Sequence, residues 1–310
     1  MNGENSSLVI AKTELASEVL AAQKRAEVES RIIIAKKFPR DYDIVRTNIL
    51  KACARPAFAE SALYSKPVAG KDIVGLSIRF VESAIQAMTN INVETQAIFD
   101  DKDKRIVRVT VIDIESNTSY NLDVTISKTV ERKKVSPYDT VLSHRENTKG
   151  ERVYLVEANE DQLTVKQNAL ISKAIRTLGL RLFPSDIADE CTKRIYETMS
   201  KGLKEDPEFE KKKIIDSFTK IGVSPDSIKK YLKRDNLNGL LERELIELRQ
   251  KYTAIKDGEC TISEAFATQE ELATEEEILD KVKEIVKASA ASGVSTDIKM
   301  PVRKVQSDNK

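Results

Sequence analysis

Residues 119–130 (SYNLDVTISKTV) alternate between two kinds of side chain along their whole length. Apolar residues occupy every second position, except that Lys128 takes one of these places, and mainly hydroxyl, amide or acidic residues occupy the others. Because successive side chains of a strand point to opposite faces of a sheet, this pattern predicts a long strand with one buried and one solvated face.

Two shorter segments upstream share this period of two. The first covers residues 91–99 and the second residues 107–111, with polar turns at 100–104 and 116–117. Connections this short join antiparallel neighbours, so the three segments predict an antiparallel β-meander. Residues 153–156 could add a short fourth strand.

Segments with helical periodicity precede the meander. Residues 13–37 predict a charged helix whose irregular apolar face suggests an arm or an oligomer contact rather than a core element. Asp41 can cap a second helix, which ends before Pro56. Residues 72–88 predict a third helix, with Ile73 among the residues at core spacing.

Residues 162–183 (QLTVKQNALISKAIRTLGLRLF) predict a helix that carries cations and no acidic residue. At about 100° per residue, the apolar residues form a stripe and the cations lie on the other side. Such a face suits a polyanion, because each cation held against a phosphate releases condensed counterions. An ordinary amphipathic helix with a solvated basic side is the alternative. The stripe consists of Ile171, Ile175, Leu178 and Leu182, and the cations are Lys166, Lys173, Arg176 and Arg181.

The order of these elements predicts four parts. A helical arm (1–39) precedes an α+β core (40–202). A change of character then starts a small all-helical domain (203–268), and an acidic helix with a flexible tail follows (269–310). The predicted fold class is therefore α+β: an antiparallel β-meander packed against helices, plus a small all-helical C-terminal domain.

Composition argues against several chemistries. A single histidine, His144, gives little support to Ser-His-Asp catalysis or a multi-histidine metal site, and no GxxxxGK[ST] phosphate-binding loop occurs. Three separated cysteines predict no disulfide framework and fit a reducing cytoplasm. No apolar run approaches the roughly 18 residues of a membrane span. The net charge is only +1, so any binding to nucleic acid has to come from a localised face.

Two segments carry a resemblance to a known family: GLSIRFVE at 75–82 and NALISKAIRTL at 168–178. The helical module with KIGVSPDSIKKYL and YTAIKDGECTISEAF continues it. Together with the meander, these segments resemble phage-encoded single-strand annealing recombinases, the Sak-like, Red-beta and RecT-like proteins related in fold to the eukaryotic Rad-type annealing protein. The resemblance covers about residues 40–268. The low net charge and the long polar loop at 136–149 depart from the family pattern, and the role of that loop stays open.

The resemblance implies a cytoplasmic, non-enzymatic protein that binds single-stranded DNA and anneals complementary strands without ATP in phage-type homologous recombination. It also implies a homo-oligomer, in the form of a ring or a filament, and no cofactor or metal. A phage exonuclease or a host single-strand-binding protein is a candidate partner of the C-terminal region. Base pairing supplies about 1.4 kcal/mol per stacked step, so annealing itself needs no nucleotide hydrolysis. The protein has to hold the backbone with the bases outward, and a basic groove suits that task.

The candidate DNA-binding residues are cations of the expected groove. Arg132, Lys133 and Lys134 form a compact cluster at the end of the meander, although a solvated strand end has the same pattern. Arg176 is the strongest single candidate, because a guanidinium can clamp a phosphate in bidentate fashion. A helix arginine such as Arg79 more commonly pairs with a nearby carboxylate. The full set is Arg132, Lys133, Lys134, Lys166, Lys173, Arg176, Arg181, Arg79, Arg105 and Arg108.

Two other classes of function stay open. A non-catalytic oligomeric scaffold or virion-associated protein would explain the near-neutral charge and the N-terminal arm without DNA. A metal-dependent nuclease would need carboxylates that converge on Mg²⁺. Glu94, Asp113 and Asp123 lie on strands of the meander and could approach one another, but they show no D-x-D or E-x-K grouping.

Overall fold

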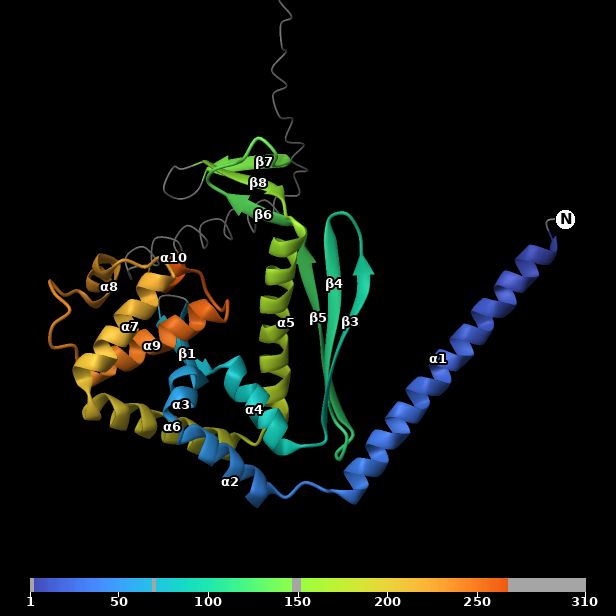
Figure 1. Cartoon of the computed structure of the whole chain (residues 1–310), viewed down its shortest axis with the longest axis horizontal. Coiled ribbons are helices and arrows are strands. Elements are labelled where there is room, and N and C mark those ends of the chain that lie inside the picture. The colour runs from blue at the N-terminus through green and yellow to red at the C-terminus, as the bar shows by residue number, and fades with distance from the viewer. Residues whose placement is uncertain (1–2, 69–70, 147–151, 267–310) are drawn as a thin grey trace, which may run out of the picture. The chain divides into compact units, whose positions relative to one another are not determined.

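A computed structural model describes residues 3–68, 71–146 and 152–266 of the protein (Figure 1). It shows an α+β fold with antiparallel sheets packed against helices and a helical C-terminal region, which confirms the predicted fold class. The helices are α1 (Gly3–Lys37), α2 (Tyr42–Cys53), α3 (Pro56–Ala62), α4 (Ile78–Met88), α5 (Glu160–Leu182), α6 (Ser185–Glu205), α7 (Pro207–Lys220), α8 (Pro225–Leu232), α9 (Glu242–Lys256) and α10 (Ile262–Ala265). The strands are β1 (Leu63–Val68), β2 (Lys71–Leu76), β3 (Ile91–Asp100), β4 (Lys104–Asp113), β5 (Thr118–Ser127), β6 (Thr129–Arg132), β7 (Val141–Glu146) and β8 (Arg152–Glu157).

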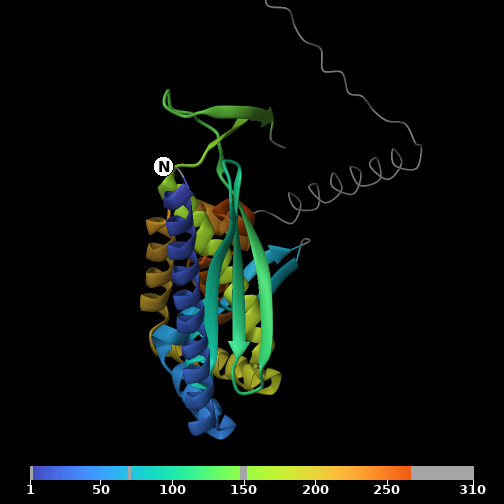
Figure 2. The ribbon, with the colours of Figure 1, turned by 90° about the vertical axis from the view of Figure 1, so that its right-hand side faces the viewer.

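The predicted meander is the sheet β3-β4-β5, with antiparallel neighbours throughout. Figure 2 shows its three strands side by side, with helices behind them. Val107, Val109 and Val111 of β4 are buried and pack against one side of α5, where Leu178 is also buried. The apolar stripe predicted for this helix lies in the same contact. The alternation in the sequence thus identified the buried face of the sheet correctly.

The long strand predicted over 119–130 divides at Lys128. Its second part, β6, belongs to a separate antiparallel sheet with the order β6-β8-β7, which we call the small sheet. Lys128 occupies an apolar position of the pattern, and its ammonium group pairs with Asp100 at 2.7 Å instead of continuing the buried face. Strand β7 was not predicted, because all of its residues are exposed and no buried face imposes alternation on them.

The third predicted helix begins later than the periodicity indicates. Residues 71–76 form β2, which pairs with β1 in an antiparallel hairpin, and α4 begins only at Ile78. The Oγ atom of Ser77 accepts a hydrogen bond from the backbone N–H of Phe80 and caps the helix at this point. Ile73, which the helical reading placed at core spacing, is exposed on the hairpin.

Two glycines allow close contacts between these layers. At Gly75 a Cβ atom would lie 2.9 Å from the ring of Tyr64, so the hairpin strands pack tightly across this position. At Gly179 a Cβ atom would lie 2.6 Å from Val81 Cγ1 and 3.2 Å from Ile85 Cδ1. Helix α5 therefore contacts α4 with its backbone at Gly179, while its apolar stripe contacts the meander.

The C-terminal helices share the main core with the N-terminal half. Ile214 and Phe218 of α7 and Leu248 of α9 belong to the same buried cluster as Val45 and Phe80. Residues up to Phe266 form one compact unit, so the boundary predicted at 202–203 does not divide the packing. The reason is that α9 buries its apolar side against β1 and α3 as well as against α7. The acidic helix and tail predicted at 269–310 lie outside the described residues.

A buried ion pair joins the segment after α1 to the last residue of strand β4. Arg40 Nη2 lies 2.9 Å from Asp113 Oδ1, and Arg40 Nε donates a hydrogen bond to the backbone oxygen of Met88 at 2.6 Å. Both side chains are almost fully buried. Burial alone would raise the pKa of Asp113, but the hydrogen bonds and charge of Arg40 outweigh it and lower that pKa. The pair therefore holds α2, α4 and β4 in a fixed relation.

We expect Gly179→Ala to lower the free energy of unfolding in urea by about 1–3 kcal/mol, because the added methyl group overpacks the contact with Val81. Gly202→Ala in α6 is the matched control, since nothing lies within 4 Å of its Cβ position. There the better helix propensity of alanine should leave stability unchanged or raise it by up to about 1 kcal/mol. Equal effects at the two positions would contradict this account of the packing.

Asp113→Asn should lower the free energy of unfolding at neutral pH. Because the pKa of Asp113 is lowered in the folded protein, its contribution is present above the ordinary value of 3.8 and is lost as the pH falls through the folded value. The stability difference between wild type and variant should therefore shrink in the acid range. Urea unfolding at a series of pH values measures it, and a difference that stays constant on acidification would show that the charge of Asp113 contributes nothing.

Candidate nucleic-acid interface

The cationic side of α5 faces the interior of the molecule. Arg176 is only 8% exposed, and its Nη1 atom lies 2.8 Å from Glu259 Oε1. Its guanidinium group also lies over the ring of Tyr64, 4.4 Å from the ring centroid. Lys173 Nζ donates to the backbone oxygen of Glu259 at 3.5 Å. Strand β1 and the turn after α9 thus cover the side of the helix that carries these cations.

Arg176 is consequently not placed to be the main phosphate contact that the sequence indicated. To reach a phosphate it would have to break its ion pair with the buried Glu259, which would then keep only Lys66, at 3.4 Å, and losing one partner of a buried pair costs several kcal/mol. Helical periodicity separates the two sides of a helix correctly, but it does not reveal whether water or another layer of the fold covers the polar side. Arg176 has a structural role in this arrangement, and Lys173 lies beside it.

Lys166 and Arg105 connect α5 to the end of the meander that carries the β3–β4 turn. Lys166 Nζ donates to the backbone oxygen of Ser127 at 3.1 Å, next to the break between β5 and β6. Arg105 pairs with Asp100 at 3.0 Å. Hydrogen bonds from Lys128 and Arg105 lower the pKa of Asp100, so this carboxylate stays ionised and neutralises part of the local positive charge. Lys166 and Arg105, both predicted to contact DNA, are half-buried and already form hydrogen bonds within the fold.

Three more of the predicted cations lie at separate places. Arg108 forms an ion pair of 2.7 Å with Asp123 on the exposed face of the meander. Arg79 is half-exposed, with Nε 4.0 Å from Asp257 Oδ1. Arg181 lies over an aromatic ring near the C-terminal end of α5. The ten predicted residues therefore do not line one continuous groove.

The small sheet and the turn that follows β6 carry the next group of predicted cations. Arg132 at the end of β6 holds Asp139 through two hydrogen bonds of 2.8 and 2.9 Å, which closes the segment between β6 and β7 into a turn. Lys133 and Lys134 lie on this turn and are exposed. Tyr138, on the same turn, is 96% exposed. Two cations and an unburied aromatic ring thus occur on one short surface segment, which we call the 133–138 turn.

The β3–β4 turn adjoins the small sheet. The backbone N–H of Lys128, just before β6, donates to the backbone oxygen of Asp103 in that turn at 2.8 Å. Lys102 and Lys104 on the β3–β4 turn are exposed, and the ammonium group of Lys104 lies over the ring of Phe99. In Figure 1 the small sheet lies at the end of α5 where the helix begins. The β3–β4 turn therefore offers cations and a partly exposed aromatic ring beside the start of the small sheet, and the 133–138 turn follows the other end of β6.

Tyr138 is the residue that sequence reasoning missed. It lies in the loop whose role was left open, between the Arg132-Lys133-Lys134 cluster and the polar residues that follow. An aromatic residue within a polar, proline-containing loop beside a basic cluster was the available signal. A tyrosine with so little contact to its own chain is free to stack with a partner.

The three carboxylates considered for a nuclease site do not converge. Glu94 pairs with Arg31, and Asp113 pairs with Arg40, while Asp123 pairs with an arginine of the meander. Within residues 3–68, 71–146 and 152–266, no group of three histidine, cysteine or acidic residues could hold a metal ion. In the same ranges, no helix has the length and apolar character needed to cross a membrane.

Comparisons with known proteins give no further identification. No family model matches the chain, and no curated protein or solved structure shows significant similarity to it.

Arg176→Met should lower the free energy of unfolding by up to about 5 kcal/mol, because it removes the closer of the two cations that pair with the buried carboxylate of Glu259 and leaves only Lys66, at 3.4 Å. Arg181→Met is the matched control, since the exposed Arg181 makes a cation–π contact worth about 0.5–1 kcal/mol. Urea denaturation followed by circular dichroism measures both. If the Arg176 variant lost no more stability than the Arg181 variant, the ion pair between Arg176 and Glu259 would not hold the layers together.

Proposed function

We propose that this protein binds single-stranded DNA on the small sheet and anneals complementary strands without ATP. The observation that carries the proposal is the 133–138 turn, where Lys133, Lys134 and the exposed ring of Tyr138 lie together. Lysine side chains of this kind bind the phosphates of a nucleic acid without reading its sequence. An exposed aromatic ring stacks with any unpaired base, because every base has a π-face. The combination favours a single strand over a duplex, whose bases are already stacked.

The limited extent of this surface suits annealing. A strand held at a few phosphates and one or two rings keeps most of its bases free to pair with a second strand. Many of the other cations of the chain are in ion pairs, which agrees with a net charge of only +1. Binding by one chain should therefore be modest and salt-sensitive, and tight binding requires several copies along one strand.

Helix α1 supports the proposal of a homo-oligomer. Between Glu18 and Lys37 nearly all of its side chains are exposed, although several are large and apolar. Among the described residues, Arg31 on α1 pairs with Glu94 of the meander at 3.1 Å, so the helix is held at its C-terminal half. Contact with another copy would remove this apolar surface from water. The exposed apolar residues of the helix include Val19, Leu20, Val28, Ile32, Ile33 and Ile34.

The same helix favours a second candidate function, a non-catalytic oligomeric scaffold or virion-associated protein. Such a scaffold would use α1 for assembly and would need no basic surface. The two candidates differ in one property, the salt-dependent binding of single-stranded DNA, which only the annealing protein should show.

Lys133→Gln combined with Lys134→Gln should weaken the binding of a fluorescent oligothymidine. If each lysine contacts one phosphate, the slope of log K against log salt should become shallower by about 1.4, at about 0.7 per contact. Lys201→Gln with Lys204→Gln in α6 removes the same charge from another exposed surface and is the matched control. Fluorescence anisotropy at several salt concentrations measures both variants. An equal loss of affinity in the two double variants would indicate only non-specific attraction. If neither variant lost affinity, the small sheet would be discarded as the interface.

A further inference from the structure

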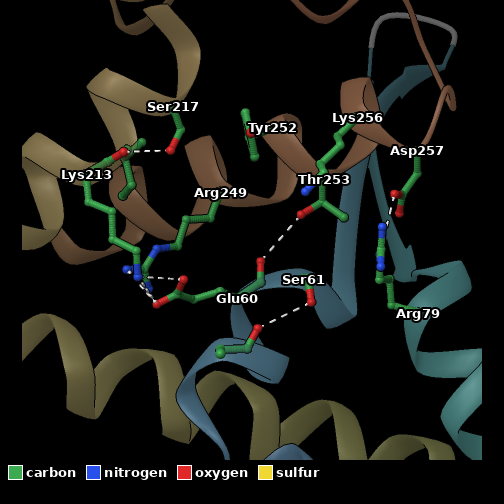
Figure 3. A pocket seen from close by; sticks show the side chains of 12 residues that line it. Glu60, Ser61, Arg79, Lys213, Ser217, Arg249, Tyr252, Thr253, Lys256 and Asp257 are labelled. Carbon is green, nitrogen blue, oxygen red and sulfur yellow. Dashed lines mark hydrogen bonds and ion pairs between the residues drawn. The ribbon is translucent and has the colours of Figure 1, made fainter. Parts of the chain in front are cut away.

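A polar cavity of about 280 Å³ lies among α3, α4, α7 and α9 (Figure 3). No residue of the small sheet lines it. Its less polar lining residues include Tyr252 and Ile214. The rest of the lining is dominated by charge, with four cations and two carboxylates. The cations are Arg79, Lys213, Arg249 and Lys256, and the carboxylates are Glu60 and Asp257.

Two of the cations are neutralised within the fold. Lys213 Nζ lies 2.8 Å from both carboxylate oxygens of Glu60. Arg249 is almost fully buried, and it pairs with Glu60 at 3.4 Å and with Glu210. These contacts tie α3 to α7 and α9, as Figure 3 shows, and they make this side of the cavity rigid.

The other two cations are not neutralised in this way. Lys256 is exposed and forms no hydrogen bond or ion pair with any residue that the structure describes. Arg79 reaches only Asp257, at 4.0 Å, and its side chain is 52% exposed. Positive charge is therefore available on this side of the cavity, where Figure 3 shows both side chains near the turn after α9. A phosphate group is a suitable ligand for such a pair.

Asp257 adds an unsatisfied acceptor to the same side. Its side chain is only 7% exposed, and within the described residues its Oδ2 atom has no hydrogen-bond partner. Burial raises the pKa of this carboxyl group, and Arg79 and Lys256 act in the opposite direction. Buried acceptors in proteins are nearly always hydrogen-bonded. A hydroxyl or amino group of a ligand in the cavity would supply the missing donor.

We propose that this cavity binds one nucleoside monophosphate unit. Its phosphate would lie between Arg79 and Lys256, a sugar hydroxyl or a base amino group would donate to Asp257, and the base would pack on Tyr252. The volume lies just below the usual range of about 300–1,000 Å³ for small-molecule sites, which suits a ligand of this size. The site goes beyond the proposed function, because its residues are separate from the small sheet.

Calorimetric titration of the full-length protein with adenosine 5′-monophosphate tests the site, with inorganic phosphate and adenosine titrated separately. Arg79→Gln with Lys256→Gln should weaken binding of the nucleotide at least about tenfold, since two charge-assisted contacts are lost. Lys212→Gln with Lys220→Gln on α7, outside the cavity, is the matched control and should leave the affinity unchanged. Asp257→Asn should weaken binding of the nucleotide but not of inorganic phosphate, because the donor that reaches Asp257 belongs to the sugar or the base, which only the nucleotide has.

The same assay shows whether the nucleoside monophosphate unit is a free nucleotide or the 5′ end of a DNA strand. Tighter binding of a 5′-phosphorylated oligothymidine than of its unphosphorylated form identifies the end of a strand as the ligand, and tighter binding of the free nucleotide identifies a mononucleotide. The variant with both lysines of the 133–138 turn replaced should retain nucleotide binding, so failure of one site does not imply failure of the other. Absence of nucleotide binding in the wild type, equal affinity for phosphate and nucleotide, or no effect of the Arg79 and Lys256 replacements would each overturn the proposal.

Discussion

The ion pair between Arg176 and Glu259 is the interaction on which the arrangement of layers depends. Helix α5 packs its apolar stripe on the meander, and its other side lies against β1 and the turn after α9. A charged side can be buried there only because the guanidinium group meets a carboxylate and an aromatic ring. On the same helix Gly179 lies close to α4, and the C-terminal helices share one core with the N-terminal half.

This use of charge decides where the protein can bind another molecule. Cations that stabilise contacts between layers, such as Lys166, Arg105 and Arg176, are not free for phosphates. Exposed cations lie on several surfaces, and those on the β3–β4 turn and on the 133–138 turn have exposed or partly exposed aromatic rings on the same turns or beside them. A nucleic-acid surface at this place is consistent with a near-neutral chain, because binding then depends on local geometry rather than on total charge.

Features with a strong period were predictable from the sequence. The three meander strands, the buried valines of β4 and the apolar stripe of α5 each follow from an alternation or a helical repeat that burial imposes. The hairpin β1–β2 and strand β7 were not predictable in this way, because β2 and β7 are mostly exposed and β1 is buried at three successive positions, so none of them shows an alternation. The candidate site was predicted only in part, since a list of cations does not show which of them meet carboxylates in the folded chain. Lys133 and Lys134 keep their predicted role as a proposal, whereas Arg176 takes a structural one.

Photo-crosslinking tests the central claim most directly, since it reports where a single strand touches the protein. The full-length protein would be irradiated with an oligonucleotide containing 5-bromodeoxyuridine, and the crosslinked peptides would be identified by mass spectrometry. We expect crosslinks at Tyr138 and its neighbours on the 133–138 turn, lost when an unlabelled single strand competes and retained when duplex DNA is added. Crosslinks confined to α1 or to the helical region around α7 and α9, with none on the small sheet, would contradict the account.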